Sequence, residues 1–228
     1  MTGVVALCAA FAGIVGLVFF YAGPATYADI ARAEGFERIP FLVPSSAPVE
    51  QRKAVRYDLP TRVALHEATL RYVFSEDPAT PMDPTTREPL FDGDERQHMA
   101  DVRGVFSGVE VGALIAAVTA LAVVFPVVRA GRTIVLRLVR GGAIVATVIV
   151  AAIAALFAVA FEPAFLAFHY VFFPQGNFLF DPATSNLLAL YPEEYWYAVT
   201  LHIGITFILA MVALTLVSAL LLRRSAAR

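Results

Sequence analysis

The stretch VGALIAAVTALAVVFPVV, Val111–Val128, contains no charged residue and decides the fold class. A helix that crosses the hydrocarbon core of a bilayer needs about 20 mainly apolar residues, so this stretch is a candidate membrane span. Three further segments have the same character: Val4–Tyr21, Ala143–Phe161 and Tyr197–Leu222. The sequence therefore predicts an all-α membrane protein with four transmembrane helices, together with a small extracellular cap formed mainly by the first outer loop.

The composition supports this interpretation. Of the 228 residues, 59% are hydrophobic and 16% are charged, and the mean hydropathy is +0.71. Soluble domains are usually less apolar and more charged. The one cysteine, Cys8, lies inside the first apolar segment, which excludes an intramolecular disulfide and a cysteine metal cluster. A cleaved signal peptide is an alternative for residues 1–28, although no Lys or Arg precedes this apolar run.

The distribution of arginine predicts the orientation in the membrane. The segment RAGRTIVLRLVRGG, residues 129–142, and the tail after Leu222 contain arginine but no acidic residue. Short loops rich in Lys and Arg stay in the cytoplasm, so we expect both termini inside and the active site at the outer face of the cell membrane. The expected segments are helix 1–22, cap 23–106, helix 107–128, cytoplasmic loop 129–142, helix 143–165, outer aromatic loop 166–196, helix 197–222 and cytoplasmic tail 223–228.

The long first loop has local signals of its own. RIPFLV, residues 38–43, is a candidate strand, and DLPTRVALHEATLRYVF, residues 58–74, has the spacing of a helix capped by Asp58. The segment SEDPATPMDPTTREPLFDGD, residues 75–94, is rich in turn formers. A further helix is expected from a cap at Asp94. The spacing of Gly104, Gly108 and Gly112 favours close approach of a neighbouring helix, and chance placement in a chain rich in Gly and Ala is the alternative.

Four histidines are the candidate chemical groups, since no nucleotide-binding loop, serine elbow or HExxH pattern is present. The predicted topology brings His98, just before the second span, to the same depth as His169, just after the third. Asp101 follows His98 on the same helical face, where it can either orient the imidazole or be a solvated acid. His66 lies in the cap, and His202 lies near the outer end of the fourth span.

The stretch FHYVFFPQGNFLFDP, Phe168–Pro182, surrounds His169 with aromatic residues. Aromatic belts at the headgroup level give one explanation. A belt does not require the turn signals Gly176-Asn177 and Asp181-Pro182, so a ring-walled pocket with a few polar groups is the other explanation. On this second interpretation, the candidate substrate-binding residues are Phe172, Phe173, Asn177, Phe178, Asp181 and Trp196.

Two stretches resemble signatures of a known family. FHYVFFPQGNFLFDPATSNLLALYPEEYW, residues 168–196, is similar to the signature loop of the lipoprotein intramolecular transacylases, and HMADV, residues 98–102, is similar to their other signature. The resemblance implies a bacterial membrane acyltransferase whose partners are a diacylglyceryl lipoprotein and membrane lipids. It implies transfer of the sn-2 acyl chain to the α-amino group of the N-terminal cysteine, giving a lyso-form lipoprotein. It also implies that His98 and His169 are catalytic.

The implied reaction is reasonable for this set of residues. The nucleophile is an amine of the substrate, so the enzyme needs neither a serine nor a cysteine nucleophile, and histidine suits the proton transfers near neutral pH. Asn177 is a candidate donor to the oxyanion. We expect no cofactor, no metal and no nucleic-acid partner. A non-enzymatic accessory membrane protein with structural histidines, a zinc hydrolase and a haem protein remain as alternatives.

Overall fold

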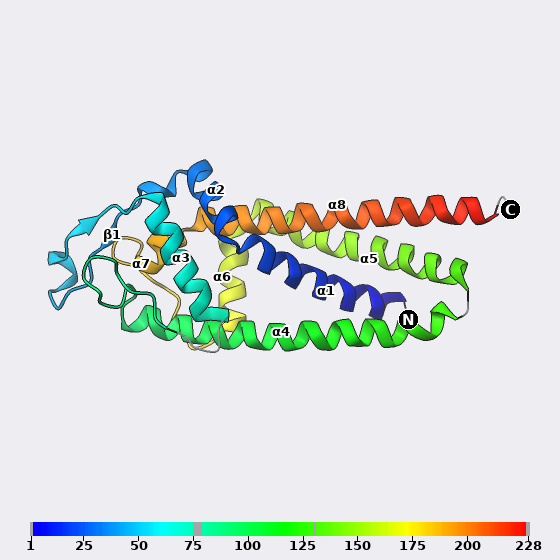
Figure 1. Ribbon diagram of the computed structural model, residues 1–228, viewed down its shortest axis with the longest axis horizontal. Coiled ribbons are helices and arrows are strands. Elements are labelled where there is room, and N and C mark those ends of the chain that lie inside the picture. Colours follow the sequence, from blue (N-terminus) through cyan, green and yellow to red (C-terminus); the bar gives the residue numbers. More distant parts are fainter. Residues whose placement is uncertain (1, 75–78, 130, 227–228) are drawn as a thin grey trace. The chain divides into compact units, whose positions relative to one another are not determined.

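The computed structural model describes residues 2–74, 79–129 and 131–226. The expected turns at residues 75–78 and the tail residue Arg228 lie outside these ranges. Four long helices each contain an apolar stretch long enough to cross a membrane, and they are α1 (Thr2–Tyr21), α4 (Gly93–Val128), α5 (Arg132–Val159) and α8 (Glu193–Ala226). The prediction of an all-α membrane protein with four spans is confirmed (Figure 1).

Shorter elements connect the long helices. Residues between α1 and α4 form α2 (Pro24–Glu34), the 3₁₀ turns η1 (Phe36–Arg38) and η2 (Val49–Gln51), strands β1 (Phe41–Leu42) and β2 (Ala54–Val55), and α3 (Leu59–Phe74). Residues between α5 and α8 form α6 (Phe161–Phe172) and α7 (Asn186–Leu190). Strands β1 and β2 are antiparallel, with Phe41 opposite Val55 and Leu42 opposite Ala54. The strand expected in RIPFLV is therefore present as β1.

The chain forms two compact units. The first, here called the span unit, consists of Met1–Phe20, Val109–Val159 and Thr200–Arg228. The second, called the histidine unit, consists of Tyr21–Gly108 and Ala160–Val199. Helices α4 and α8 each contribute residues to both units. His66, His98 and His169 all belong to the histidine unit, and His202 belongs to the span unit.

The span unit packs through small residues and keeps an apolar surface. Ala10, Ala146, Val150 and Phe207 form a buried cluster that joins α1, α5 and α8. A Cβ added at Gly204 would lie 3.3 Å from Ala154 Cβ, so these two helices approach closely. Large side chains that point away from the cluster are exposed, such as Leu121 at 70%. In water this surface would be unfavourable, whereas lipid tails cover it at little cost.

The sequence predicts that a neighbouring helix approaches α4 closely at Gly104, Gly108 and Gly112. This prediction is wrong for the first two glycines. A Cβ added at Gly104 or Gly108 would have none of the described atoms within 4 Å. Only Gly112 has a close neighbour, because a Cβ there would lie 3.4 Å from a ring carbon of Phe11. Spacing by four places the glycines on one face of the helix, but it does not determine whether another helix packs there.

Helix ends follow local capping chemistry. Asp58 caps α3 by accepting a hydrogen bond from Thr61 N at 3.0 Å, as the sequence predicts. The cap of α4 is Asp92 and not Asp94, because Asp92 Oδ1 accepts from Glu95 N at 2.9 Å and Glu95 Oε2 accepts from Asp92 N at 3.0 Å. This reciprocal pair is a capping box. It makes Glu95 part of the helix start, one turn before His98.

Two helix boundaries differ from those that the sequence predicts. Helix α5 already begins at Arg132, so the arginine-rich segment that was expected to be a loop is largely helical, in keeping with the good helix propensity of Arg and Leu. Helix α5 then ends at Val159, and α6 begins at Phe161. Pro163 explains this break, since proline lacks an amide hydrogen and is tolerated only in the first turn of a helix. His169 consequently lies on a short separate helix.

Candidate active site

The structure brings His98 of α4 and His169 of α6 together. Their ring centroids are 6.0 Å apart and the ring planes differ by 21°, so the two imidazoles lie nearly parallel. His98 lies in the charged first turns of α4, among Asp94, Glu95, Arg96, Asp101 and Arg103, ahead of the apolar stretch of that helix. His169 lies on α6, whose 12 residues are too few to cross a membrane.

Aromatic rings surround this pair. Phe173 is 4.7 Å from His98 and 5.5 Å from His169, measured between ring centroids, and Phe173 is only 3% exposed. Phe180 lies 5.7 Å from His98, while Phe165 and Phe178 lie 4.3 Å and 5.1 Å from His169. Aromatic rings thus form a large part of the surroundings of the two imidazoles.

The hydrogen bonding of His169 defines its tautomer. Its Nδ1 lies 2.8 Å from the carbonyl oxygen of Phe165, one turn earlier in α6. A carbonyl oxygen only accepts, so Nδ1 carries the proton and donates it. Burial lowers the pKa of His169, with an opposing contribution from this backbone contact. The neutral form is therefore favoured near pH 7, and its Nε2 has a lone pair available to accept a proton.

His98 differs from His169 because its Nδ1 is buried and has no hydrogen-bond partner among the described residues. The side chain is 6% exposed. Burial and then the neighbouring His169 lower the pKa of His98 to about 4, while Asn177 and Asp101 act in the opposite direction. His98 is therefore a neutral imidazole whose proton affinity depends on the groups around it.

A polar contact fixes the loop after α6 against α4. Asp101 Oδ2 accepts hydrogen bonds from Gln175 Nε2 at 2.7 Å and from Asn177 Nδ2 at 2.6 Å. The expectation that Asp101 bonds the His98 imidazole directly is not met, because its carboxylate binds these two amides instead. The expectation that Asn177 donates to an oxyanion is weakened for the same reason, since its amide group already donates to Asp101.

A tight turn makes this loop geometry possible. Gly176 has φ of 79°, and its N–H donates to the carbonyl of Phe173 at 3.0 Å. Residues with a Cβ seldom adopt this left-handed conformation, so glycine is strongly favoured at this position. The turn predicted at Gly176-Asn177 is present, and it places Gln175 and Asn177 against Asp101.

The six candidate substrate-binding residues occupy different places. Phe173 and Phe178 contact the histidines, and Asn177 lies beside them. Trp196 is one ring further away, 6.1 Å from Phe165. Phe172 is 43% exposed and packs on Phe168, and the Asp181 carboxylate accepts from Ala183 N at 2.9 Å within its own turn. Phe172 therefore packs at the end of α6, and Asp181 stabilises its own turn.

His66 belongs to a second, fully buried cluster. Its Nε2 lies 2.9 Å from the carbonyl oxygen of Ala22, and its Nδ1 lies 2.8 Å from the hydroxyl of Tyr191. Its ring stacks on Tyr27 at 4.3 Å. Because the carbonyl accepts, Nε2 carries the proton and Nδ1 accepts from Tyr191. Both nitrogens are occupied, a bonding pattern typical of a structural histidine. Its role could not be deduced from the sequence.

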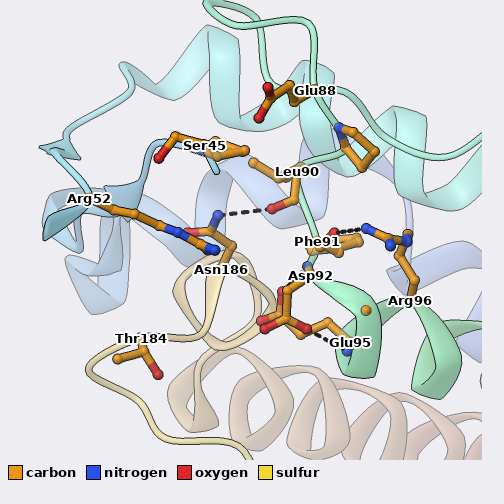
Figure 2. Close-up of a pocket in the computed structure, with 13 residues that line it drawn as sticks. Ser45, Arg52, Glu88, Leu90, Phe91, Asp92, Glu95, Arg96, Thr184 and Asn186 are labelled. Atoms are coloured by element: carbon orange, nitrogen blue, oxygen red, sulfur yellow. Dashed lines mark hydrogen bonds between the residues drawn. The ribbon is translucent and has the colours of Figure 1, made fainter. Parts of the chain in front are cut away.

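Glu95 connects the start of α4 to α7 and was not identified from the sequence. Its Oε1 accepts from Ser185 Oγ and from Leu187 N, at the N-terminus of α7. The side chain is 2% exposed. Figure 2 shows Glu95 beside Asp92, with Asn186 of α7 bonded to the carbonyl of Leu90. These contacts hold the first turns of α4, and so the backbone that carries His98.

The same region contains an open cavity of about 260 Å³ (Figure 2). Arg52 and Arg96 line it together with three acidic residues, and neither His98 nor His169 does. The Arg96 guanidinium already donates to the carbonyl of Phe91 at 2.7 Å. The cavity therefore lacks the chemistry of the histidine pair. Within the described ranges, no group of three or more His, Cys, Asp or Glu residues is arranged to hold a metal ion.

The sequence and fold agree with one family. Residues 53–196 match the family model described as lipoprotein intramolecular transacylase Lit. The chain belongs to this family. The match spans more than half of the chain and includes His98 and His169. The site described above therefore belongs to a member of a family of membrane acyltransferases.

Solved structures share the fold of this family member. The membrane integral lipoprotein intramolecular transacylase Lit from Bacillus cereus superposes with a TM-score of 0.76 at 15% identity, covering 100% of this chain and 96% of that one. Two further structures of the same Bacillus cereus protein, each with one histidine replaced, by arginine or by alanine, give TM-scores of 0.71 and 0.70 at 14% identity. They cover 99% and 100% of this chain, and 92% and 94% of theirs. No curated protein sequence matches the chain.

Proposed function

We propose that this transacylase moves the sn-2 acyl chain of a diacylglyceryl lipoprotein to the α-amino group of the same molecule's N-terminal cysteine. The amine nitrogen attacks the ester carbonyl, a C–N bond forms, and the bond to the glyceryl oxygen breaks. The proton lost by nitrogen ends on that oxygen. The observation that carries the proposal is the His98–His169 pair inside a ring-lined site, in a chain of this family.

The site suits the geometry of an internal transfer. The attack closes a ring of eight atoms, and medium rings close poorly in solution. Holding the amine and the ester together supplies part of the barrier through orientation, which in favourable cases amounts to several kcal/mol. Phe173 and Phe178 form walls for acyl chains next to the histidines, and Trp196 extends this apolar lining through Phe165.

The two histidines divide the proton transfers. His169 Nε2 accepts the proton of the attacking amine, because its Nδ1–H is committed to Phe165 O. His98 faces His169, receives that proton in turn and delivers it to the departing glyceryl oxygen. The reaction has no net uptake or release of protons, so neutral imidazoles at the start and the end are consistent with the lowered pKa values of both residues.

The function is tested in a bacterial host whose lipoproteins carry only the diacylglyceryl group. Expression of this chain should convert a reporter lipoprotein to a form with one acyl chain on nitrogen and one on glycerol. Substrate and product have equal mass, so fragment ions of the N-terminal peptide must assign the chains. An unchanged reporter in the presence of well-inserted protein contradicts the transacylase proposal and favours a non-enzymatic accessory protein.

We also propose that both termini are cytoplasmic and that the histidine pair lies at the outer face, on the basis of the arginine distribution. In a background with Cys8 replaced by alanine, Thr85→Cys should react with an impermeant thiol reagent in intact cells, whereas Thr133→Cys should be protected. The reverse pattern inverts the topology and places the histidines inside.

A further inference from the structure

A chain of polar side chains leads from Asp101 towards His98. The Asp101 carboxylate accepts from the Asn177 amide, and a carboxylate oxygen of this kind can only accept. The NH₂ group of Asn177 must therefore face Asp101, and its Oδ1 must face away. The Gln175 amide donates to the same carboxylate oxygen, so the loop after α6 is held at two points.

Two buried polar atoms at this place lack a hydrogen-bond partner among the described residues. They are Nδ1 of His98 and Oδ1 of Asn177. Each costs free energy while it is unpaired and removed from water, and a hydrogen bond between them satisfies both. The Asn177 side chain already acts on His98, because it opposes the lowering of the His98 pKa by burial and by His169.

We propose that Asp101 is a positioning residue for His98 and that it acts through Asn177. Asp101 holds the amide so that Oδ1 receives the proton on His98 Nδ1. This leaves His98 Nε2 as the nitrogen that delivers a proton to the departing glyceryl oxygen. The inference rests on the proposed transacylase function, because it assigns a role to Asp101 only if His98 takes part in proton transfer.

The arrangement also has an electrostatic consequence. The negative charge of Asp101 polarises the amide and stabilises His98 when it carries a second proton. The other titratable group that faces His98 is His169 of α6, whereas the loop presents the uncharged Phe173, Asn177 and Phe180. Removing the charge of Asp101 therefore shifts the part of the pH–rate profile that depends on His98 to lower pH.

A double-mutant cycle tests the inference on the full-length protein in lipid nanodiscs with a diacylated reporter. Asp101→Ala and Asn177→Ala should each lower kcat about tenfold or more, the effect of a hydrogen bond to a group that becomes charged, with KM little changed. The double variant should be no slower than Asn177→Ala alone, because Asp101 acts through Asn177. Asp94→Ala, an exposed acid on the same helix, is the matched control and should keep normal activity.

Two further variants separate the possible outcomes. Asp101→Asn keeps the shape but not the charge, and it should retain more activity than Asp101→Ala while its pH–rate limb moves to lower pH. Losses that multiply in the double variant, or a normal rate and pH profile for Asp101→Ala, overturn the positioning role. His169→Ala serves as a reference. If it remains active, the two-histidine function itself fails, whereas an inactive His169→Ala beside a normal Asp101→Ala removes only the role of Asp101.

Discussion

The histidine unit contains two aromatic clusters, one around His66 and one around the His98–His169 pair. The two clusters differ in how the imidazoles are bonded. His66 uses both nitrogens, one on Ala22 O and one on Tyr191 OH. His169 uses only Nδ1, and His98 Nδ1 has no partner among the described residues. A ring environment alone therefore does not identify a catalytic histidine. Nitrogens without a fixed partner distinguish the proposed catalytic pair from His66, because a group that moves protons must exchange partners during the reaction.

The largest expected effect is a loss of activity when a histidine of the His98–His169 cluster is replaced. His169→Ala should lower the transacylation rate by about 10² to 10⁴, the usual contribution of a general acid or base, with little change in the unfolding midpoint. Added imidazole should restore part of the rate, since it can occupy the vacated space and accept the proton. Initial rates on purified protein, with and without imidazole, measure both effects. A full rate without His169 would remove it from the mechanism.

Replacing His66, at the centre of the other aromatic cluster, should lower the stability of the protein instead of its activity. His66→Ala leaves a cavity beside Tyr27 and unpairs the hydroxyl of Tyr191 and the carbonyl of Ala22. We expect a loss of about 2–5 kcal/mol in the free energy of unfolding, by analogy with other large-to-small changes at buried sites. Any fall in activity should follow the folded fraction, and imidazole should not restore it. Denaturation of His66→Ala and wild type in the same detergent provides the comparison.

The pH dependence of stability provides a further test of the role of His66. Burial lowers the pKa of His66 to about 4, whereas the unfolded chain has the ordinary value near 6.5. The unfolded state thus binds more protons between these values. The stabilising contribution is complete above about pH 6.5 and is lost as the pH falls towards 4, by at most about 3 kcal/mol. His66→Gln should flatten this part of the stability profile; an unchanged slope would show that His66 is not the titrating group.

A smaller effect is expected at the turn that supports the His98–His169 pair. Gly176→Ala places a Cβ on a residue with φ of 79°, at a cost of about 1–2 kcal/mol. Rates should fall only a few-fold, since the loop can still reach Asp101. Gly104→Ala is the matched control, because a Cβ there meets none of the described atoms within 4 Å. Equal behaviour of the two variants would show that the turn is not needed in its present form.

Apolar length and helix periodicity explain which parts of the fold were predictable. The four spans, β1 and the helix capped by Asp58 follow from local sequence patterns. The cap of α4 was assigned to Asp94, but the helix already begins at Gly93, and only the reciprocal bonds with Glu95 identify Asp92 as the cap. The helical start of α5 was missed because arginine marks the cytoplasmic side and is also a good helix former.

The site shows the same division between local and distant information. His98 and His169 follow from the family signatures and the predicted topology, and the structure places their rings together. Phe165 was missed, although its position four residues before His169 on a helix was a usable signal. The contacts of Glu95 with α7 and of Asp101 with Asn177 join residues 92 and 76 positions apart. No spacing rule reveals such pairs, because they depend on how the elements pack.

The most direct test of the central claim compares three variants in one assay, with His98→Ala, His169→Ala and His66→Gln expressed beside wild type. Fragment ions of a reporter lipoprotein's N-terminal peptide show whether one acyl chain has moved from glycerol to the cysteine nitrogen. At equal amounts of folded protein, His66→Gln should give the transferred pattern, and the other two variants should leave both chains on glycerol. Transferred product at wild-type levels from His98→Ala and His169→Ala would contradict the account, even for a chain of this family.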